Sequence, residues 1–298
     1  MGKSLKVSII VVTHNRHKLC NLMLEYLDKQ IVKPYEVIVI DDASDPPFKA
    51  LKSNHKYKLV ILRIDQELGV SACRNLGVIY SKGDIIAFID DDAIPDPKWI
   101  EAIEYHITKY NADIVGGLCL PIYLKETPSW WDSRILGCYL AIHNTFIVGC
   151  NFAVKRDTFN KVGLFRPHLG RVRGLKISNE ETELILRAYK KGVKIIYCPT
   201  IRVYHFVNPS RLSLKYLIKR AWYQGISIYL TCGYRFIDVV MNERKLRKLS
   251  LCEHLKECYS SRLKPLKIQA LLLRIILLVI TIIGMLYAMK SASKKYLS

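Results

Sequence analysis

Residues 83–101, GDIIAFIDDDAIPDPKWIE, contain the pattern on which the fold depends. Five apolar residues, Ile85 to Ile89, run directly into three consecutive carboxylates, Asp90 to Asp92. A short continuous apolar run is typical of a strand that is buried on both faces. Neighbouring like charges repel each other, so these carboxylates need something positive beside them. The stretch therefore predicts a buried strand that ends at a charged site.

The same pattern recurs along the first part of the chain. Further strands are predicted at 7–12, 36–40, 59–64 and 114–118, and helices at 18–29, 69–81 and 99–110. Apolar strands that alternate with helices indicate an α/β fold, with a mainly parallel, Rossmann-like sheet flanked by helices. Ligands bind such sheets beyond the carboxyl ends of the strands. Polar residues follow three strands, at 13–16, 41–42 and 90–92, so we expect one site at that edge.

The second half of the chain is less regular. We expect a long loop with short helices at 121–144, strands at 147–154, 193–197 and 201–206, and helices at 179–191 and 213–230. Domain boundaries follow from this pattern: a catalytic domain at 1–230, a basic linker at 231–267 and an apolar helix at 268–289.

Charge is distributed unevenly over the 298 residues. The net charge is +20, and the segment from Arg211 onward holds 17 basic and 4 acidic residues, a net of 13. An excess of this size indicates a polyanionic partner. Because the charge gathers beside the apolar tail, we expect an anionic membrane surface and no specific nucleic acid. The nine cysteines have no metal-like spacing, which favours reduced thiols and a location on the cytoplasmic side.

The tail, IQALLLRIILLVITIIGMLYAM at 268–289, has Arg274 as its one charge. Its 22 residues would just cross a hydrocarbon core of about 30 Å. Arg274 lies near the N-terminal end, where its side chain could extend to the headgroups. The segment is therefore expected to be a transmembrane or interfacial helix, with a buried core helix as the alternative.

The aspartates at 90–92 allow four interpretations. A solvated acidic turn is the simplest. A calcium-binding loop is excluded because Pro95 stands where that loop needs glycine. A phosphatase-type nucleophile needs downstream partners that have no evident place in the sequence. The last is a divalent cation that bridges the carboxylates and a diphosphate, since Mg²⁺ and Mn²⁺ prefer oxygen ligands and share them with phosphates.

Six segments in order resemble glycosyltransferase family 2. They are VSIIVVTHNR, EVIVIDDAS, ELGVSACRNLG, AFIDDDAIPDPKWIE, GCNFAVKRDTFNKVGLF and NEETELILRAYKKGVKIIYCPTIRVYHF. The resemblance covers roughly residues 5–230 and implies the nucleotide-sugar transferase fold called GT-A. An isolated DxD is a common pattern, whereas six motifs in order are specific.

The resemblance implies roles for individual residues at the donor site. The residues expected to bind the donor, a nucleotide-diphosphate sugar and most simply a UDP-sugar, are Thr13, Asn15, Asp42, Arg74, Asp90 and Asp91. Asp91 is the member of this set that could point away, Asp42 could instead form a turn, and Arg74 could instead lie on the surface. Mn²⁺ or Mg²⁺ would be held by Asp92, Asp90 and His205, although a lone histidine is often structural.

Glu180 and Glu181 match an acidic pair of the family at the start of a helix. Family members commonly have aspartate in the second place, where this chain has the longer Glu181. The resemblance assigns Glu181 as the general base that takes the proton of an attacking sugar hydroxyl. The metal would stabilise the leaving diphosphate on the other side of the sugar, so the configuration would invert. Acidic residues that complement a helix dipole are the structural alternative.

The sequence thus predicts a metal-dependent, inverting hexosyltransferase at the cytoplasmic face of the cell membrane. Its acceptor would be a hydroxyl of a lipid-linked glycan or of another saccharide. A polyprenyl phosphate acceptor is the first alternative, although an anionic phosphate oxygen needs no base. A basic nucleic-acid-binding protein is the second, and no motif supports it.

Overall fold

The computed structural model describes residues 5–140, 147–171, 174–232 and 267–296. The strands are β1 (Val7–Thr13), β2 (Glu36–Asp42), β3 (Lys58–Ile64), β4 (Ile85–Phe88), β5 (Ala93–Pro95), β6 (Ile114–Tyr123), β7 (Phe152–Lys155) and β8 (Ile195–Val207). The α-helices are α1 (His17–Asp28), α2 (Val70–Tyr80), α3 (Trp99–Tyr110), α4 (Ser133–Leu136), α5 (Thr158–Val162), α6 (Glu180–Lys190), α7 (Leu214–Cys232) and α10 (Ile268–Tyr296). Two 3₁₀ helices are η1 (Gly137–Leu140) and η2 (Pro209–Leu212).

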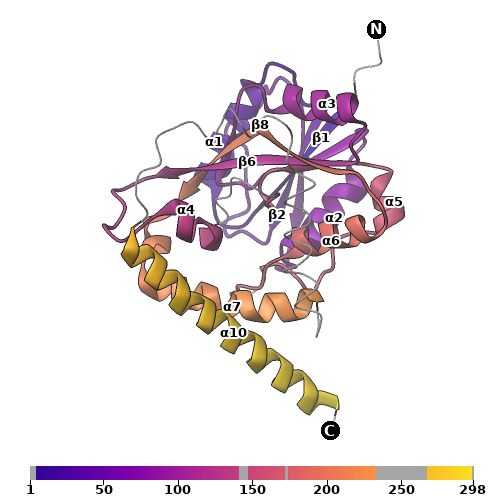
Figure 1. Ribbon diagram of the computed structural model, residues 1–298. Helices are drawn as coiled ribbons and strands as arrows, with labels where there is room; N and C mark the ends of the chain where they lie inside the picture. The colour runs from indigo at the N-terminus through magenta and orange to yellow at the C-terminus, as the bar shows by residue number, and fades with distance from the viewer. Residues whose placement is uncertain (1–4, 141–146, 172–173, 233–266, 297–298) are drawn as a thin grey trace.

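One eight-stranded sheet, in the order β3-β2-β1-β4-β7-β6-β8-β5, carries helices on both faces (Figure 1). β1 pairs in parallel with β2 and β4, and β2 pairs in parallel with β3. Successive residues of β1 enter two different cores. Ile9 and Val11 lie in the core with α1 and α3, whereas Ile10 lies in the core with α2 and α6. Burial on both faces explains the continuous apolar runs and confirms the predicted α/β fold.

The other half of the sheet is mixed. β7 runs antiparallel to β4 and β6, while β8 runs parallel to β6 and antiparallel to β5. The strand expected at 147–154 is shorter, and the two expected at 193–197 and 201–206 form one strand, β8. β6 continues through residue 123, where a loop was expected. β5 has three residues, too few to show any periodicity in the sequence.

A bulge lets β6 and β8 pair over their whole length. It lies between Gly117 and Leu118. A Cβ atom on Gly117 would lie 2.1 Å from the carbonyl oxygen of Ile201, so any other residue would push the strands apart. The pairing matters for the site because it carries β8 forward to His205.

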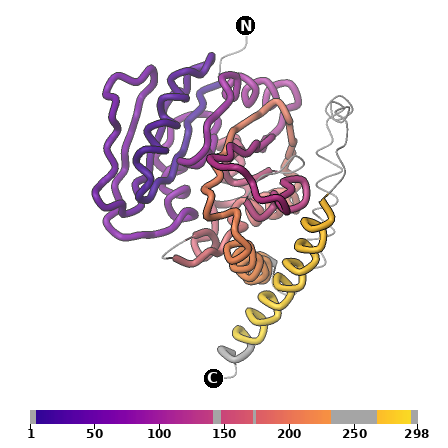
Figure 2. The backbone as a smooth tube through the Cα atoms, turned by 90° about the vertical axis from the view of Figure 1, so that its left-hand side faces the viewer, coloured from indigo at the N-terminus to yellow at the C-terminus, as the bar shows by residue number. Residues whose placement is uncertain are grey.

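Helix α10 lies on the outside of the domain and packs against α7 (Figure 2). Two glycines allow a close approach. A Cβ on Gly225 would lie 1.9 Å from the Thr281 carbonyl oxygen, and one on Gly284 would lie 2.4 Å from that of Trp222. Small residues permit such backbone contacts between helices. The tail is therefore docked on the domain, and α7 is the helix that holds it.

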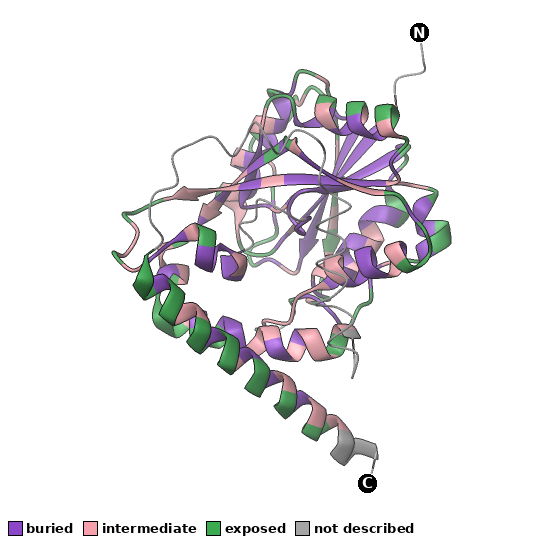
Figure 3. Ribbon diagram, in the orientation of Figure 1, coloured by how far each residue is buried: buried purple, intermediate pink, exposed green. Residues whose placement is uncertain are grey.

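The outward face of α10 is apolar and exposed (Figure 3). Residues 268–292 have a mean hydropathy of 2.6 and are long enough to cross a membrane. Arg274 does not extend outward as expected: its Nη1 donates to the Ile135 carbonyl oxygen and lies 3.0 Å from Cys138 Sγ. The start of α10 packs against α4, which brings the Arg274 side chain to these acceptors. The expected linker at 231–267 falls almost entirely outside the described residues.

Candidate active site

Three parallel strands end side by side and bring the predicted polar segments together. Thr13 at the end of β1 lies next to Asp41 of β2, and the three aspartates follow β4. The Thr13 hydroxyl donates a hydrogen bond of 2.8 Å to Asp91 Oδ2. The predicted polar segments therefore do meet at one edge of the sheet, and their role as a binding site stays a prediction.

The three consecutive aspartates have three different environments. Asp91 is 3% exposed and accepts a hydrogen bond of 2.7 Å from Arg16 Nη1. The side chain of Asp90 is 37% exposed and pairs with Arg74 Nη2 at 3.1 Å. Asp92 is 5% exposed, and its Oδ2 lies 2.9 Å from Arg16 Nη1. Asp91 thus points into the protein, while Asp90 and Asp92 face the site.

Arginine side chains offset the electrostatic repulsion among these carboxylates. Arg16 contacts both Asp91 and Asp92, and their charges raise its pKa even though burial opposes this. Arg211, in η2, lies 3.4 Å from Asp92 Oδ2. The sequence predicted a role for neither arginine. Arg16 is part of the quoted THNR segment, which could have drawn attention to it, whereas nothing in the sequence singles out Arg211.

Asp92 and His205 form a buried pair at the heart of the site. His205 Nε2 lies 3.1 Å from Asp92 Oδ1, because β5 pairs with β8 in a register that sets Ala93 opposite His205. Burial disfavours both charges, but their attraction raises the pKa of His205 and, together with Arg16, lowers that of Asp92. In the described part of the chain, Asp92 Oδ1 has no hydrogen-bond donor besides this histidine.

These groups have the donor set of a divalent-metal site. Asp90, Asp92 and His205 each offer one ligand atom, and these atoms lie within 4.8 Å of one another. Carboxylate oxygens with one imidazole nitrogen suit Mn²⁺, and carboxylates with water suit Mg²⁺. The residues therefore fit the metal that the sequence led us to expect.

Arg74 connects the aspartates to helix α6. It is 3% exposed, which excludes a surface position. Its Nη1 donates to Glu180 Oε1 at 3.0 Å, and its Nη2 donates to Asp90 Oδ1 at 3.1 Å and to the Gly149 carbonyl oxygen at 2.9 Å. Glu180 and Asp90 raise the pKa of Arg74 against the effect of burial. One guanidinium thus fixes two sides of the site relative to each other.

Glu181 lies in the first turn of α6 and differs from its neighbour. Its Oε1 accepts a hydrogen bond of 3.2 Å from the Gly149 N–H. Burial and the adjacent Glu180 raise the pKa of Glu181 to about 7, although Arg74 opposes the shift. Glu180 is instead bound by Arg74. A carboxyl group with a pKa near neutral is suited to accept a proton at physiological pH.

Asp42 and Asn15 hold loops at the same edge. Both oxygens of Asp42 accept backbone N–H bonds, from Leu68 at 2.8 Å and from Gly69 at 2.9 Å. Asn15 has a left-handed backbone, with φ of 56°, and its side chain accepts from the Asp45 N–H at 2.7 Å. These bonds give both residues a structural role, and their contacts with a nucleotide stay a prediction.

Helix α7 supports the start of α6. Arg220 Nη2 donates to Ser178 Oγ at 3.0 Å, and Gln224 Nε2 donates to Asn179 Oδ1 at 3.1 Å. Ser227 Oγ accepts from the Ser178 N–H at 3.0 Å. Two residues directly before α6 are therefore held in place by a single face of α7.

Known proteins are similar to this chain in sequence. Residues 8–163, just over half of the chain, match the model of glycosyl transferase family 2. A glucosyl-dolichyl phosphate glucuronosyltransferase from Haloferax volcanii is 28% identical over 240 residues, which are 75% of this chain and 76% of that protein. The uncharacterised glycosyltransferase YwdF of Bacillus subtilis is 37% identical over 152 residues, 46% of this chain and 56% of its own length.

Solved structures share the fold. The mannosyltransferase PcManGT from Pyrobaculum calidifontis, in complex with GDP-Man and Mn²⁺, covers 98% of this chain and 76% of its own, with a TM-score of 0.54 and 16% identity. Residues 1–349 of S. aureus TarS in complex with UDP cover 98% of this chain and 92% of its own, with a TM-score of 0.52 and 16% identity. The family match and the shared fold together establish that the chain belongs to glycosyltransferase family 2 and has a GT-A-like fold.

Proposed function

We propose that this glycosyltransferase moves a sugar from a nucleotide-diphosphate sugar to a hydroxyl of a lipid-linked glycan or another saccharide, with inversion. One observation carries the proposal. The buried Arg74 joins Asp90, at the carboxylate edge, to Glu180, at the start of the helix that carries Glu181. Inverting transfer needs a donor site and a base at a fixed separation across the sugar, and this arginine supplies that connection.

The donor diphosphate would bind at the carboxylate edge. Asp90, Asp92 and His205 would hold Mn²⁺ or Mg²⁺, which, when bound, stabilises negative charge on the leaving diphosphate. Arg16 and Arg211 flank the same aspartates and would donate hydrogen bonds to phosphate oxygens. The remaining candidates for donor contacts are Thr13, Asn15, Asp42, Arg74 and Asp91. UDP-sugars and GDP-mannose are the donors to test first, because the similar structures hold UDP and GDP-Man.

The acceptor hydroxyl would approach from the side of α6. Glu181 would accept its proton, and the Gly149 N–H would orient the carboxylate while the proton moves. Because the base and the diphosphate would lie on opposite sides of the transferred sugar, the attack inverts the anomeric configuration. Glu180 stays bound to Arg74 and would act by fixing the start of α6.

A lipid-linked acceptor at the cytoplasmic face of the membrane is supported by four observations. The Haloferax relative is named for a glucosyl-dolichyl phosphate. Helix α10 exposes a long apolar face, and the chain from Arg211 onward holds most of the net positive charge. Six of the cysteines in the described ranges are free thiols, which suits a reducing compartment. In this proposal residues 1–230 form the catalytic domain, residues 231–267 connect it to the apolar helix, and residues 268–289 bind the membrane.

Direct transfer to a polyprenyl phosphate is a second candidate. The observation that favours it is the buried cation Arg220, which lies close enough to Glu181 for the two charges to interact. A phosphate nucleophile is already anionic, so this reaction would not need Glu181 as a base. The effect of replacing Glu181 separates the two candidates.

A donor screen tests the main proposal. Purified protein is incubated with each nucleotide sugar, with and without Mn²⁺ and a membrane lipid extract, and nucleotide release is measured. We expect release that requires the metal and that rises when the extract is added. Release from no donor, or release that is unchanged by chelation of the metal, contradicts the proposal.

A further inference from the structure

Arg220, on α7, is a buried arginine whose hydrogen bonds are incomplete. The residue is 9% exposed, and its Nη2 donates to Ser178 Oγ at 3.0 Å. Its Nε and Nη1 are buried and have no hydrogen-bond partner among the residues that the structure describes. In the same ranges no carboxylate forms an ion pair with it. A buried charge without a counter-ion is unfavourable, so this position is suited to an anion that the chain itself does not supply.

Arg220 and Lys176 share a cationic neighbour, Arg171, and Lys219 acts on Lys176 as well. Burial and the charge of Arg171 lower the pKa of Arg220. Burial also lowers the pKa of Lys176, and Lys219, Arg171 and Arg211 add to that effect. We call Lys176, Lys219 and Arg220 the cation cluster. Cations held this close repel one another, and a bound anion would relieve the repulsion.

The cation cluster lies beside the proposed base. Ser178, the hydrogen-bond partner of Arg220, directly precedes Asn179 at the start of α6. The negative charges of Glu180 and Glu181 act on Arg220 and oppose the repulsion from the cations. Neither carboxylate is its ion-pair partner, since Glu180 pairs with Arg74. An anion at Arg220 would therefore lie next to the acceptor hydroxyl rather than among the aspartates of the donor site.

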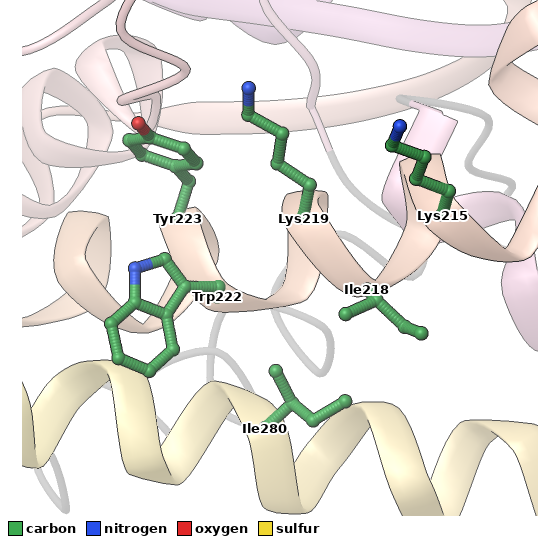
Figure 4. A pocket seen from close by; sticks show the side chains of 6 residues that line it. All are labelled: Lys215, Ile218, Lys219, Trp222, Tyr223 and Ile280. Atoms are coloured by element: carbon green, nitrogen blue, oxygen red, sulfur yellow. The ribbon is translucent and has the colours of Figure 1, made fainter.

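A groove of about 690 Å³ extends from Lys219, a member of the cation cluster, to α10 (Figure 4). It is lined by Lys215, Ile218, Lys219, Trp222, Tyr223 and Ile280. Figure 4 shows the lysine side chains on the side of α7 that faces away from α10, while Ile218 and Trp222 extend toward α10. Lys219 belongs to both the groove and the cluster. A ligand that matches this surface has an anionic group at one end and an apolar chain at the other.

We infer that the cation cluster binds the phosphate ester of a lipid-linked acceptor and that the groove holds the first part of its lipid chain. The inference rests on the proposed function, which supplies the lipid-linked glycan. Phosphate oxygens would accept hydrogen bonds from the free Nε and Nη1 of Arg220. The saccharide would extend from the phosphate toward Glu181. A saccharide acceptor without a phosphate would leave Arg220 unpaired.

Binding of a short lipid phosphate tests the inference without donor or metal. Farnesyl phosphate, farnesol and inorganic phosphate are titrated by calorimetry into the full-length protein in detergent. We expect farnesyl phosphate to bind at least about tenfold more tightly than either other ligand, because it alone fills both the cluster and the groove. Arg220→Gln, which keeps a donor for Ser178, and Lys219→Ala should each weaken it about tenfold or more. Lys82→Ala, at an exposed lysine between α2 and β4, should bind as wild type does.

Several outcomes would overturn the inference. Equal affinities for farnesol and farnesyl phosphate would show that the protein has no phosphate site in this position. Equal affinities for inorganic phosphate and farnesyl phosphate would show that the groove does not bind the lipid chain. If Arg220→Gln fails to fold, Lys219→Ala tests the inference, because Lys219 is exposed. Unchanged binding of farnesyl phosphate by Lys219→Ala would refute a phosphate site at the cation cluster. Because no donor is present, a negative result leaves metal-dependent donor binding intact, and failure of the donor proposal would leave binding of farnesyl phosphate intact.

Discussion

Replacing Glu181 by glutamine removes the proposed base while keeping the shape of the side chain. The amide cannot take a proton from the acceptor hydroxyl, so transfer should fall by about 10²–10⁴, the usual effect of losing a positioned base. Donor affinity should stay nearly unchanged, because Glu181 forms its hydrogen bond with the Gly149 N–H and not with a donor-site side chain. The loss should therefore be in kcat rather than in the KM of the donor.

We expect the pKa of Glu181 to set the pH dependence of transfer by the wild-type enzyme. Burial and Glu180 raise this pKa to about 7, so the carboxyl holds its proton at acidic pH and releases it as the pH rises. A single group with this pKa is about one-tenth ionised at pH 6, half ionised at pH 7 and about nine-tenths ionised at pH 8. The transfer rate should therefore rise about tenfold from pH 6 to pH 8, whereas the Glu181→Gln rate should not follow this curve.

The assay is single-turnover transfer at saturating donor and metal, measured over this pH range. Glu101→Gln, at an exposed position on α3, is the matched control and should reproduce the wild-type curve. A wild-type rate that is flat between pH 6 and pH 8 would refute the assignment of the titrating group. A Glu181→Gln enzyme that keeps more than about a tenth of the wild-type rate would point to a phosphate acceptor, which needs no base.

Three further changes test other parts of the structure. Asp92→Asn should abolish Mn²⁺-dependent binding of the nucleotide diphosphate in calorimetry, because it removes a charge that pairs with His205 in the proposed metal site. The control Asp65→Asn, at a side chain that is 95% exposed, should have no effect. Equal binding by both variants would contradict the metal site. Gly225→Ala should destabilise the contact between α7 and α10 by about 1–3 kcal/mol, since the new Cβ meets the Thr281 carbonyl oxygen at 1.9 Å; resistance of α10 to proteolysis equal to wild type would show that the helices adjust. Deleting residues 264–298 should release the protein from membranes while metal-dependent hydrolysis of the donor persists. The assay needs detergent, because the deletion uncovers the face of α7 that packs against α10. A truncated chain that still sediments with membranes would place the membrane anchor elsewhere.

The parallel half of the sheet could be predicted because its strands are buried on both faces. Each is a continuous apolar run, and each ends at polar residues that the parallel arrangement brings to one edge. The mixed half could not be predicted to the same degree. Its pairings depend on Gly117, which permits a bulge, and on β5, which is too short to leave a pattern. The position of His205 beside Asp92 follows from that pairing, and only the family resemblance indicated it beforehand.

The site residues that the sequence did not indicate are arginines. Arg16, Arg211 and Arg220 are ordinary basic residues in a chain with 46 lysines and arginines. Their importance comes from burial and from the charges that tertiary structure places near them, and a one-dimensional pattern contains neither. Arg74 illustrates the same limit. Its motif was recognised, but its partners Asp90 and Glu180 are 16 and 106 residues away along the chain.

Helix α7 connects the start of α6 to helix α10. On one side, Arg220 and Gln224 hold Ser178 and Asn179, the two residues that precede α6 and its glutamates. On another side, Gly225 lets the backbone of α10 approach closely. Because the two contacts lie within six residues of one helix, a movement of α10 relative to the domain would shift the start of α6 as well. A lipid that is bound between α7 and α10 would therefore stabilise the position of the base, and the acceptor would help to complete the site at which it reacts.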